Sequence, residues 1–526
     1  MKTILLSFLF CFLCKSTYSQ APAIQWKKCF GGSNDDMGLS ICESPTGGFY
    51  ISGHTESHNG DVHHNNGYGN LWLFRIDNNG NLIWEKSYGG SFGYEISNNM
   101  QITKDGGIIM IGKASSQDGD VIGMHGSSPD IWVVKTDSSG NLLWQKCLGG
   151  GNDEVGNEIK ETKDGGYILI GTTRSLTGDG DLSFVHLPPD AWAVKLDSVG
   201  NILWEKTLGG YDGDYGVSVV EGDTNVFYFS ISSDSDDSII TGNHGFQDLL
   251  IAKLDASHNI VWQKCFGGSY NDWGGSIYFD ANNKIKIGAN TESNDFDISN
   301  FSGASDIWLF TIDSTNLESS ICFGGSSYDT DRKTHLISGN GSIIAGTSSS
   351  TNFQTNCLNT FKSDFFIMTT DSLGNFIWSK CLGGSEDDIA YDAIETSDGG
   401  YIAVGSTEST DYDVVGNHGL KDVWVVKLSP PGVNVPELEA GVSDFTAYEN
   451  SVGSIQLEFN AELASELKLS LFDLMGRCVL KENFDCIAGM NTHRTPSFSP
   501  TPGIYVLTLS DARGAMVKKV FVNGGK

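Results

Sequence analysis

The sequence has few cationic side chains. Its 526 residues include 33 Lys and Arg against 65 Asp and Glu, which gives a formal net charge of -32. A surface this acidic repels phosphate backbones and anionic headgroups, so nucleic acid and anionic membranes are disfavoured as partners. Cations, or neutral ligands such as glycans, are compatible with this charge.

Long apolar runs are also missing. Beyond residue 20, no stretch approaches the roughly 18 to 20 apolar residues of a membrane-spanning helix. The N-terminus combines Lys2, an apolar run from Ile4 to Cys14, and the small residues Thr17 and Ser19 before Gln20. This pattern predicts a secretory signal peptide over residues 1–19 and a mature chain without a transmembrane segment.

No segment has a helical apolar period of useful length. Instead, an opening motif such as NLLWQKCLGG returns about every 60 residues. Within one period, for example residues 154–206, four strand-like runs are separated by turn signals such as KDGG and DSVGN. The motif positions are Trp26, Trp84, Trp144, Trp204, Trp262, Trp378 and a degenerate copy at Ser319. Seven such copies predict an all-β repeat protein.

The third run of each repeat, such as IWVVK, is apolar on consecutive residues, which indicates a sheet covered on both faces. Propeller blades are covered in this way by their neighbours. The array begins with a fourth strand at Ile24–Trp26 and finishes with a third strand at Asp422–Ser429. We therefore expect residues 20–429 to form a seven-bladed β-propeller of four-stranded blades, the last one closed by the N-terminal strand.

The cysteines show no zinc spacing with histidine. Cys478 and Cys486 are a candidate disulfide, with two free thiols as the alternative. Five cysteines share one repeat position, and equivalent positions in different repeats lie too far apart to bridge, so these are expected to be buried free thiols. They are Cys29, Cys147, Cys265, Cys322 and Cys381.

The repeat pattern stops at Pro430, where a Pro- and Gly-rich linker over residues 430–442 precedes a short β-domain over residues 443–526. Its runs LFDLMGRCVL, PGIYVLTLS and AMVKKVFV carry a D-x-x-G-R turn, a G-x-Y strand and a basic last strand. The motif residues are Asp473, Gly476, Arg477, Gly503, Tyr505, Lys518 and Lys519.

This segment resembles the type A C-terminal sorting domain of the type IX secretion system. The resemblance implies a small β-sandwich and the secretion machinery as a partner. It also implies release from the cell or display on its outer surface. The propeller repeats resemble those of secreted repeat proteins that often carry such domains, which implies no reaction.

An acidic position follows each Gly-Gly pair by four residues. It could form a carboxylate ring at the channel mouth, or each carboxylate could accept backbone N–H bonds where a strand begins; its presence in nearly every blade favours the second interpretation. The residues are Asp36, Tyr94, Glu154, Asp214, Asp272, Asp329 and Asp388.

A second acidic pattern is a D-x-D pair in the long loop between the second and third strands. Oxygen pairs two residues apart can bind calcium, which is the candidate cofactor, but they also stabilise Asp-Gly turns, and the turn is the favoured interpretation. The pairs are Asp118/Asp120, Asp179/Asp181, Asp234/Asp236, Asp295/Asp297 and Asp411/Asp413.

These loops and the turns after Gly-Gly are expected to share one face of the propeller, where a glycan or protein ligand would bind. Aromatic residues there could stack on sugars or pack between strands. They are Tyr94, Tyr215, Tyr270, Trp273 and Tyr328.

The propeller region holds only three arginines, Arg75, Arg174 and Arg332, at inequivalent positions, which argues against a sialidase-like grip on a substrate carboxylate. The sequence favours a binding or adhesion protein without catalytic activity. A propeller-based glycosidase or polysaccharide lyase, and a purely structural surface protein, are the alternatives.

Overall fold

The computed structural model describes residues 21–431 except 66, 353–356 and 358–361, and residues 442–522 except 452–453, 462–464, 473–477, 496–502 and 511–514. The boundary between two compact units falls after Pro431. The predicted signal peptide lies outside the described residues and stays a prediction. In the part that the structure describes, no helix is long and apolar enough to cross a membrane.

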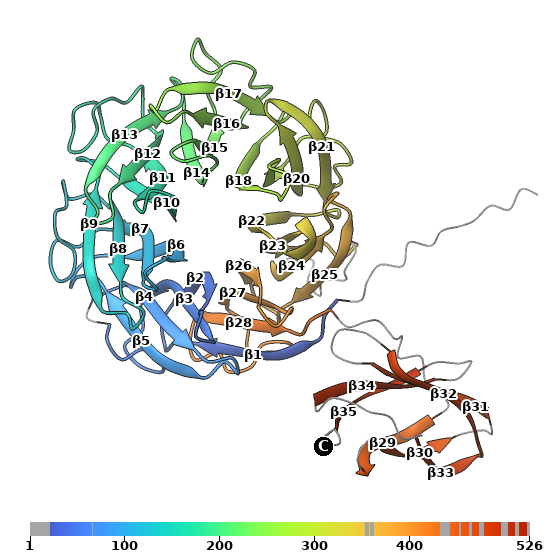
Figure 1. Ribbon diagram of the computed structural model, residues 1–526. Coiled ribbons are helices and arrows are strands. Elements are labelled where there is room, and N and C mark those ends of the chain that lie inside the picture. The colour runs from blue at the N-terminus through green and yellow to red at the C-terminus, as the bar shows by residue number, and fades with distance from the viewer. Residues whose placement is uncertain are drawn as a thin grey trace, which may run out of the picture. The chain divides into compact units, whose positions relative to one another are not determined.

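The N-terminal unit consists of seven four-stranded antiparallel sheets arranged as the blades of a ring (Figure 1). The seven-bladed propeller is thus confirmed. The inner strands, one each for blades 1 to 7, are β2 (Asp36–Glu43), β6 (Ile96–Ile102), β10 (Glu154–Glu161), β14 (Asp214–Glu221), β18 (Asp272–Phe279), β22 (Asp329–Leu336) and β26 (Asp388–Glu395).

The other strands follow in the same order of blades. The second strands are β3 (Phe49–Thr55), β7 (Ile108–Ala114), β11 (Tyr167–Thr173), β15 (Phe227–Ser233), β19 (Ile285–Thr291), β23 (Ser342–Ser348) and β27 (Tyr401–Thr407). The third strands are β4 (Asn70–Ile76), β8 (Asp130–Thr136), β12 (Asp190–Leu196), β16 (Asp248–Leu254), β20 (Asp306–Asp313), β24 (Asp364–Thr370) and β28 (Asp422–Leu428). The outer strands are β5 (Leu82–Tyr88), β9 (Leu142–Leu148), β13 (Ile202–Leu208), β17 (Ile260–Phe266), β21 (Asn316–Phe323), β25 (Phe376–Leu382) and β1 (Ile24–Phe30).

The N-terminal strand closes the ring as predicted. β1 pairs antiparallel with β28, placing Phe30 opposite Val423. Behind this pairing, Trp72 and Phe74 of blade 1 share one buried cluster with Val404 and Val423 of blade 7. The core therefore lies between neighbouring blades, which explains why the third strands are buried on both faces.

The recurring Trp, Lys and Gly of the repeat join each blade to the next. The Trp26 indole donates to the Asn78 carbonyl oxygen at 2.9 Å, and a Cβ on Gly80 would lie 2.9 Å from the indole ring. Lys28 Nζ donates to Asn81 Oδ1 at 2.9 Å in the same hairpin. The same Trp-Gly contact is made by Trp84 with Gly140 and by Trp144 with Gly200, so these outer strands fit closely against the hairpin of the following blade.

The strand directions give the propeller two different faces. The face where inner strands begin carries the turns after Gly-Gly and the long loops between second and third strands; we call it the loop face. The opposite face carries the hairpins between first and second and between third and fourth strands; we call it the hairpin face. It also carries the short 3-10 turn Ser338–Asn340.

The C-terminal unit contains two antiparallel sheets around its own core, which confirms the predicted β-sandwich. One sheet has the order β29 (Val442–Ser451), β30 (Ser454–Ala461) and β33 (Gly489–Arg494). The other has the order β32 (Cys478–Cys486), β31 (Ser465–Phe472), β34 (Gly503–Ser510) and β35 (Ala515–Val522).

The proposed Cys478–Cys486 disulfide is wrong. Both residues lie in the single strand β32, at its two ends. Eight residues of extended chain separate their Cα atoms by roughly 26 Å, far beyond the roughly 7 Å limit for a disulfide.

The sorting-domain motif residues are only partly described. Tyr505 is buried in β34, which begins at Gly503, and Lys518 and Lys519 lie in β35. The turn residues of the motif lie outside the described residues; they are Asp473, Gly476 and Arg477.

Candidate functional site

The carboxylate after each Gly-Gly pair is buried and completes the turn that enters the blade. Asp36 accepts hydrogen bonds from the Gly32 N–H at 2.8 Å, from Ser57 Oγ at 2.7 Å and from Thr55 Oγ1. Burial raises the pKa of Asp36 to about 6, against these hydrogen bonds that lower it. Its counterparts in five other blades are equally buried, so the position serves strand entry: Glu154, Asp214, Asp272, Asp329 and Asp388.

Blade 2 differs from the predicted alignment. Its turn after Gly-Gly is one residue longer, so the buried carboxylate is Glu95, which accepts from the N–H of Ser116 at 2.9 Å. The predicted residue, Tyr94, instead packs half-buried against His54, with ring centroids 3.9 Å apart. A fixed offset from Gly-Gly could not reveal the inserted residue.

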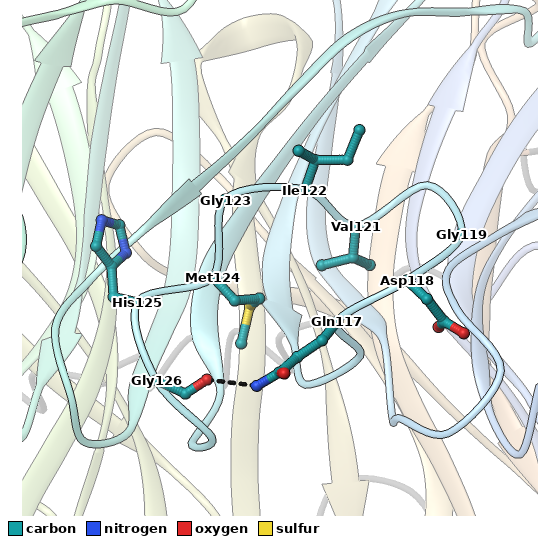
Figure 2. A pocket seen from close by; sticks show the side chains of 9 residues that line it. All are labelled: Gln117, Asp118, Gly119, Val121, Ile122, Gly123, Met124, His125 and Gly126. Carbon is teal, nitrogen blue, oxygen red and sulfur yellow. Dashed lines mark hydrogen bonds between the residues drawn. The ribbon is translucent and has the colours of Figure 1, made fainter.

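The aspartates of the long loops also bind the Gly-Gly turns. In blade 2, the Ser91 N–H donates to Asp118 at 2.8 Å and the Gly89 N–H to Asp120 at 3.2 Å. The same loop surrounds a cavity of about 440 Å³ that includes Asp118 and His125 (Figure 2). Asp118 is its one lining carboxylate, so this cavity lacks the several oxygens of a calcium loop.

Three further pairs repeat these bonds. The first aspartate of each accepts from the residue after Gly-Gly at 2.8 Å: Asp179 from Gly151, Asp295 from Ser269 and Asp411 from Ser385. The second ones differ: Asp181 and Asp297 each accept from the first glycine at 3.3 Å, whereas Asp413 pairs with Lys27 at 3.1 Å. Such bonds match turn-stabilising aspartates; calcium binding by these loops stays a prediction.

The pair predicted in blade 4 was misaligned. Asp237 takes the role of the first aspartate there, because it accepts from the N–H of Tyr211 at 2.6 Å. Of the two predicted residues, Asp234 accepts a hydrogen bond from the Gln247 side chain at 2.9 Å. Asp236 is the residue immediately before Asp237. The run SDSDDS contains three aspartates, and the sequence alone did not show which of them bonds to the Gly-Gly turn.

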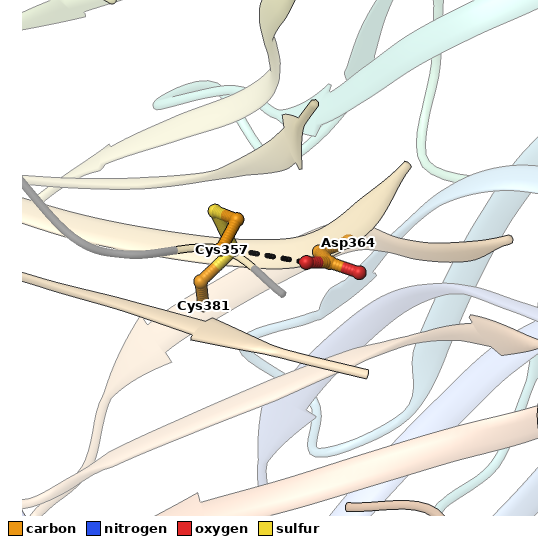
Figure 3. Close-up of side chains that lie close together, drawn as sticks. All are labelled: Cys357, Asp364 and Cys381. Carbon is orange, nitrogen blue, oxygen red and sulfur yellow. Dashed lines mark hydrogen bonds between the residues drawn. A yellow bond between two sulfur atoms is a disulfide. The ribbon is translucent and has the colours of Figure 1, made fainter. Parts of the chain in front are cut away.

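Cys381 is not a free thiol, contrary to the prediction for its repeat position. It forms a disulfide with Cys357, beside Asp364 (Figure 3). Among the described residues this trio is the one group of potential metal ligands within mutual reach, but bonded sulfurs cannot act as thiolates. The other four cysteines of this position are free, and burial raises their pKa to about 12: Cys29, Cys147, Cys265 and Cys322.

The predicted aromatic residues divide into two groups. Tyr270 and Tyr328 are exposed in the turns after Gly-Gly, whereas Tyr94 is half-buried at the end of such a turn. Tyr215 and Trp273 are half-buried in the second position of β14 and β18. Both rings therefore remain partly accessible to solvent.

Further exposed aromatic residues surround the loop face, in positions that sequence reasoning missed. Several form pairs across the two kinds of loop, such as Tyr68 with Phe92 and Phe246 with Tyr270. The sequence did not reveal them because these aromatic residues occupy different positions in the variable loop of each repeat. Besides the predicted Tyr270 and Tyr328, the exposed rings are Tyr68, Phe92, Phe184, Tyr211, Phe246, Phe296 and Tyr412.

One position of the inner strands links blades around the central channel. It follows a β-bulge, and its side chain usually accepts the N–H of the next blade: Ile159 N–H donates to Asn99 at 3.3 Å, and Ile277 N–H to Ser218 at 3.2 Å. We call the set the channel ring: Ser40, Asn99, Glu158, Ser218, Ser276, Lys333 and Asp392.

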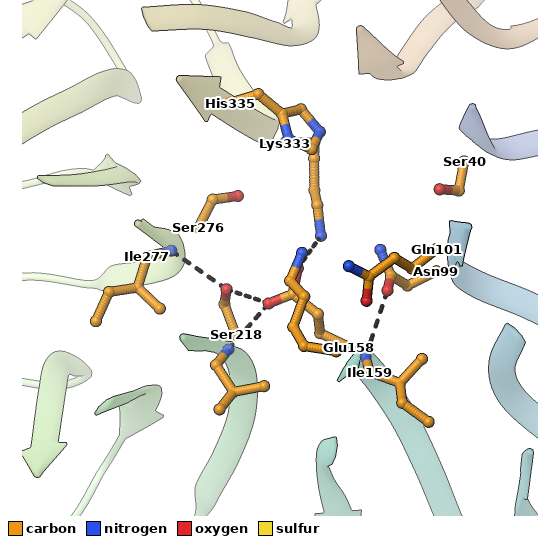
Figure 4. Close-up of polar contacts among 12 residues, drawn as sticks. Ser40, Asn99, Gln101, Glu158, Ile159, Ser218, Ser276, Ile277, Lys333 and His335 are labelled. Carbon is orange, nitrogen blue, oxygen red and sulfur yellow. Dashed lines mark hydrogen bonds and ion pairs between the residues drawn. The ribbon is translucent and has the colours of Figure 1, made fainter. Parts of the chain in front are cut away.

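Lys333 breaks this symmetry because an ammonium has no acceptor atom. Its Nζ instead reaches from β22 across the channel to Glu158 on β10, at 2.9 Å (Figure 4). Lys160 contacts the same carboxylate at 3.0 Å. Although burial opposes ionisation, the two lysines hold the pKa of Glu158 well below its usual range.

A second charged pair lies beside the first. His335 Nε2, also on β22, lies 2.7 Å from Asp392 Oδ1 on β26. Despite burial, His335 and Lys333 lower the pKa of Asp392, so it is a carboxylate acceptor and His335 Nε2 carries the donated proton. The inner strand of blade 6 thus supplies two cationic or basic groups to a channel otherwise lined mostly by neutral side chains.

A cavity of about 520 Å³ lies where the inner strands end, on the hairpin face. Its lining includes Lys160, His335 and Asp392 together with the side-chain amides of Asn99 and Gln101. Sequence reasoning placed a ligand over the channel on the opposite, loop face. The strand DTDRKTHL of the sixth repeat was the available signal, since no other first strand carries three basic side chains.

The fold defines an all-β propeller followed by a second, smaller β-domain. Residues 451–523 match the family described as the secretion system C-terminal sorting domain. This confirms the predicted sorting domain, and with it type IX export to the medium or the outer cell surface. No curated protein matches the sequence.

Solved structures resemble the chain only distantly. A protein of unknown function from Dyadobacter fermentans is 10% identical with a TM-score of 0.40, covering 78% of this chain and 99% of its own. A family PL25 ulvan lyase is 12% identical with a TM-score of 0.41, covering 75% and 96%. The N11 neuraminidase-like protein of A/flat-faced bat/Peru/033/2010 is 11% identical with a TM-score of 0.31, covering 62% and 84%. These values carry no activity over to this protein.

Proposed function

We propose that the protein is a secreted or surface-displayed binding protein that holds glycans on the loop face of its propeller. The observation that carries the proposal is the set of exposed aromatic rings on that face. Exposed apolar groups gathered at one surface mark interaction sites. Aromatic rings provide flat apolar surfaces that suit the C–H faces of sugars.

Phe246 and Tyr270 form the clearest platform. The two residues are 67% and 55% exposed. Their ring centroids lie 6.5 Å apart with an interplanar angle of 23°, so both rings offer a surface in nearly the same orientation. A packing role would have buried them, whereas exposure leaves their faces available to a ligand.

A second platform lies between blades 3 and 4. Phe184 and His186 contact one another and line a cavity of about 410 Å³ that also contains Glu205 and Lys206. Tyr211 lies next to His186, at 5.9 Å between ring centroids. Aromatic walls with a few polar groups are typical of small-ligand sites.

Several such platforms on one rigid disc support adhesion. Each single contact with a sugar is weak, but a polymer that reaches two platforms gains from the high effective concentration of the second one. The net charge of -32 favours neutral glycans over anionic polymers on this face.

The charged channel gives little support to the glycosidase alternative. A glycosidase needs one carboxylic acid that stays protonated near neutral pH. The two channel carboxylates, Glu158 and Asp392, both have lowered pKa values because cationic partners hold them ionised. This pair in the channel therefore does not supply the protonated acid of a glycosidase, and the exposed aromatic rings favour binding.

The test is a glycan array probed with the full mature chain, followed by affinity measurements on the best ligand. We expect the double variant Phe246→Ala/Tyr270→Ala to weaken binding about tenfold or more. A tenfold change in Kd corresponds to roughly 1.4 kcal/mol of binding free energy. Leu203→Ala is the control, since Leu203 is 58% exposed on outer strand β13. The proposal fails if no array glycan binds, or if neither this variant nor Phe184→Ala/Tyr211→Ala weakens binding.

A further inference from the structure

We propose that the cavity on the hairpin face is a second binding site, which takes a small organic carboxylate into the end of the central channel. The site is independent of the glycan platforms, because it lies on the opposite face. Its evidence is the hydrogen-bonding state of the groups that line it, which leaves donors available and acceptors engaged.

Each carboxylate of the cavity already accepts two or three hydrogen bonds from the protein. Asp392 receives Ser40 Oγ and the Ile41 N–H, both at 3.1 Å, in addition to His335. Glu43 receives the N–H of Ser397 at 2.7 Å and its Oγ at 2.6 Å. Glu395 receives the N–H and Oγ of Ser338, both at 2.6 Å.

The donors of the cavity retain unused protons. Lys160 Nζ contacts Glu158 alone among the described residues and keeps further N–H groups available. The Asn99 and Gln101 oxygens accept from Ile159 at 3.3 Å and from Glu161 at 2.8 Å, which leaves both amide NH₂ groups without a protein partner in the described part of the chain. These three donors come from the adjacent strands β6 and β10, so one wall of the cavity offers hydrogen bonds to an acceptor.

A carboxylate is the acceptor that suits this wall. A cationic ammonium beside amide donors favours an anionic oxygen pair over a hydroxyl or a carbonyl. The remaining lining includes Ile102, Ile337 and Ile394, which can receive a short apolar body. A volume of about 520 Å³ is in the usual range of small-ligand sites, roughly 300 to 1,000 Å³.

The Lys333–Glu158 pair explains why such a site ends within the channel. It belongs to the channel ring, two residues deeper along β22 and β10 than His335 and Lys160. Because it crosses from blade 6 to blade 3, it obstructs the channel below the cavity (Figure 4). The one strand that departs from the repeat thus supplies both this cross-channel pair and the His335 that lines the cavity.

Calorimetry with the full mature chain tests the site with 4-methylpentanoate, galacturonate and leucine, and with 4-methylpentanamide as the uncharged match of the first. We expect at least one carboxylate to bind, and 4-methylpentanamide not to. The first two compounds separate an apolar carboxylate from a sugar acid. Leucine asks whether an added ammonium is accepted beside Glu43 and Glu395.

Lys160→Met should weaken the bound carboxylate about ten- to hundredfold, the usual range for a charge-assisted hydrogen bond. Lys163→Met is the matched control: Lys163 is exposed in the hairpin that follows β10 and donates to the Gly222 carbonyl. His335→Gln keeps a donor for Asp392 and serves as a second variant that should fold. The proposal is overturned if no carboxylate binds, if the amide binds equally well, or if Lys160→Met and Lys163→Met behave alike while both remain folded by thermal melt.

Discussion

The inner strand of blade 6 has the same backbone arrangement as the inner strands of the other blades, but it carries a lysine where they carry hydrogen-bond acceptors. All seven strands carry a β-bulge at the same place. In blades 4 and 5 the residue after the bulge is a serine that accepts an N–H from the next blade. In blade 6 it is Lys333, which gives up that bond and crosses the channel to Glu158.

This difference separates the scaffold from a candidate site. Features repeated around the ring fit neighbouring blades together and require equivalent positions. The buried carboxylate at the strand entry is present in every blade, and the Trp-Gly contact recurs at three junctions between blades. A site that binds one ligand requires that one blade differ from the others at an equivalent position. The departure in β22 is therefore more informative about function than any of the repeated residues.

The largest expected effect concerns the cross-channel pair. Glu158→Leu leaves Lys333 without its buried partner, so the free energy of unfolding should fall by about 3–5 kcal/mol in urea denaturation. Ser276→Ala in β18 removes one neutral hydrogen bond from Thr334, made at 3.1 Å, and should cost about 1 kcal/mol. Equal losses for the two variants would show that blade 6 is energetically no different from its neighbours.

A double variant sharpens the same comparison. Lys333→Ser/Glu158→Ser gives both positions the residue found in blades 1, 4 and 5 and removes both buried charges together. We expect it to be more stable than Glu158→Leu, because the more buried ammonium, that of Lys333, is removed together with its partner. Lys160 also loses its contact with Glu158 in both variants, but its side chain is partly exposed to solvent. A double variant that is less stable than Glu158→Leu would contradict this account.

Cysteines at one repeat position provide the next comparison. Cys381 is bonded to Cys357 across 24 residues, whereas Cys147 is a buried free thiol. Loss of a disulfide that closes a loop of this length should lower the free energy of unfolding by about 3 kcal/mol in Cys357→Ala/Cys381→Ala. Cys147→Ala should cost about 1 kcal/mol; similar costs by chemical denaturation would mean that the disulfide adds no stability.

The smallest effect is a pH dependence of the buried carboxylates. Burial raises the pKa of Asp272 to about 6, above that of an unfolded aspartate, so the folded state binds the proton more tightly. Its contribution to stability is therefore full below about pH 4 and is lost as the pH rises to about 6. Asp272→Asn should flatten the change in Tm between pH 4.5 and 6.5.

The control for this experiment is Asp118→Asn. Hydrogen bonds from Ser91 lower the pKa of Asp118, so its contribution is lost only as the pH falls below its ordinary range. The variant should leave the dependence between pH 4.5 and 6.5 unchanged. A Tm profile that Asp272→Asn does not alter would show that Asp272 is ionised throughout this window.

Much of the scaffold was predictable because it repeats. Seven copies of a motif specify the number of blades, and a chain that begins with a fourth strand and ends with a third specifies how the ring closes. Prediction failed where one copy departs from the others. The turn of blade 2 holds one extra residue, so the buried carboxylate is Glu95 and not the predicted position, Tyr94. In blade 4, the run SDSDDS led to the prediction of Asp234 and Asp236, whereas Asp237 binds the Gly-Gly turn.

The sequence by itself determined the all-β class, the propeller, its closure by the N-terminal strand and the C-terminal sorting domain, because these depend on patterns that are local or repeated along the chain. Only the tertiary structure decided that Cys381 bonds to Cys357, that aromatic rings from different loops form exposed pairs, and that Lys333 meets Glu158. The last two residues are separated by 175 positions and lie on opposite sides of the channel. No periodicity links them, since their contact arises only when the ring closes.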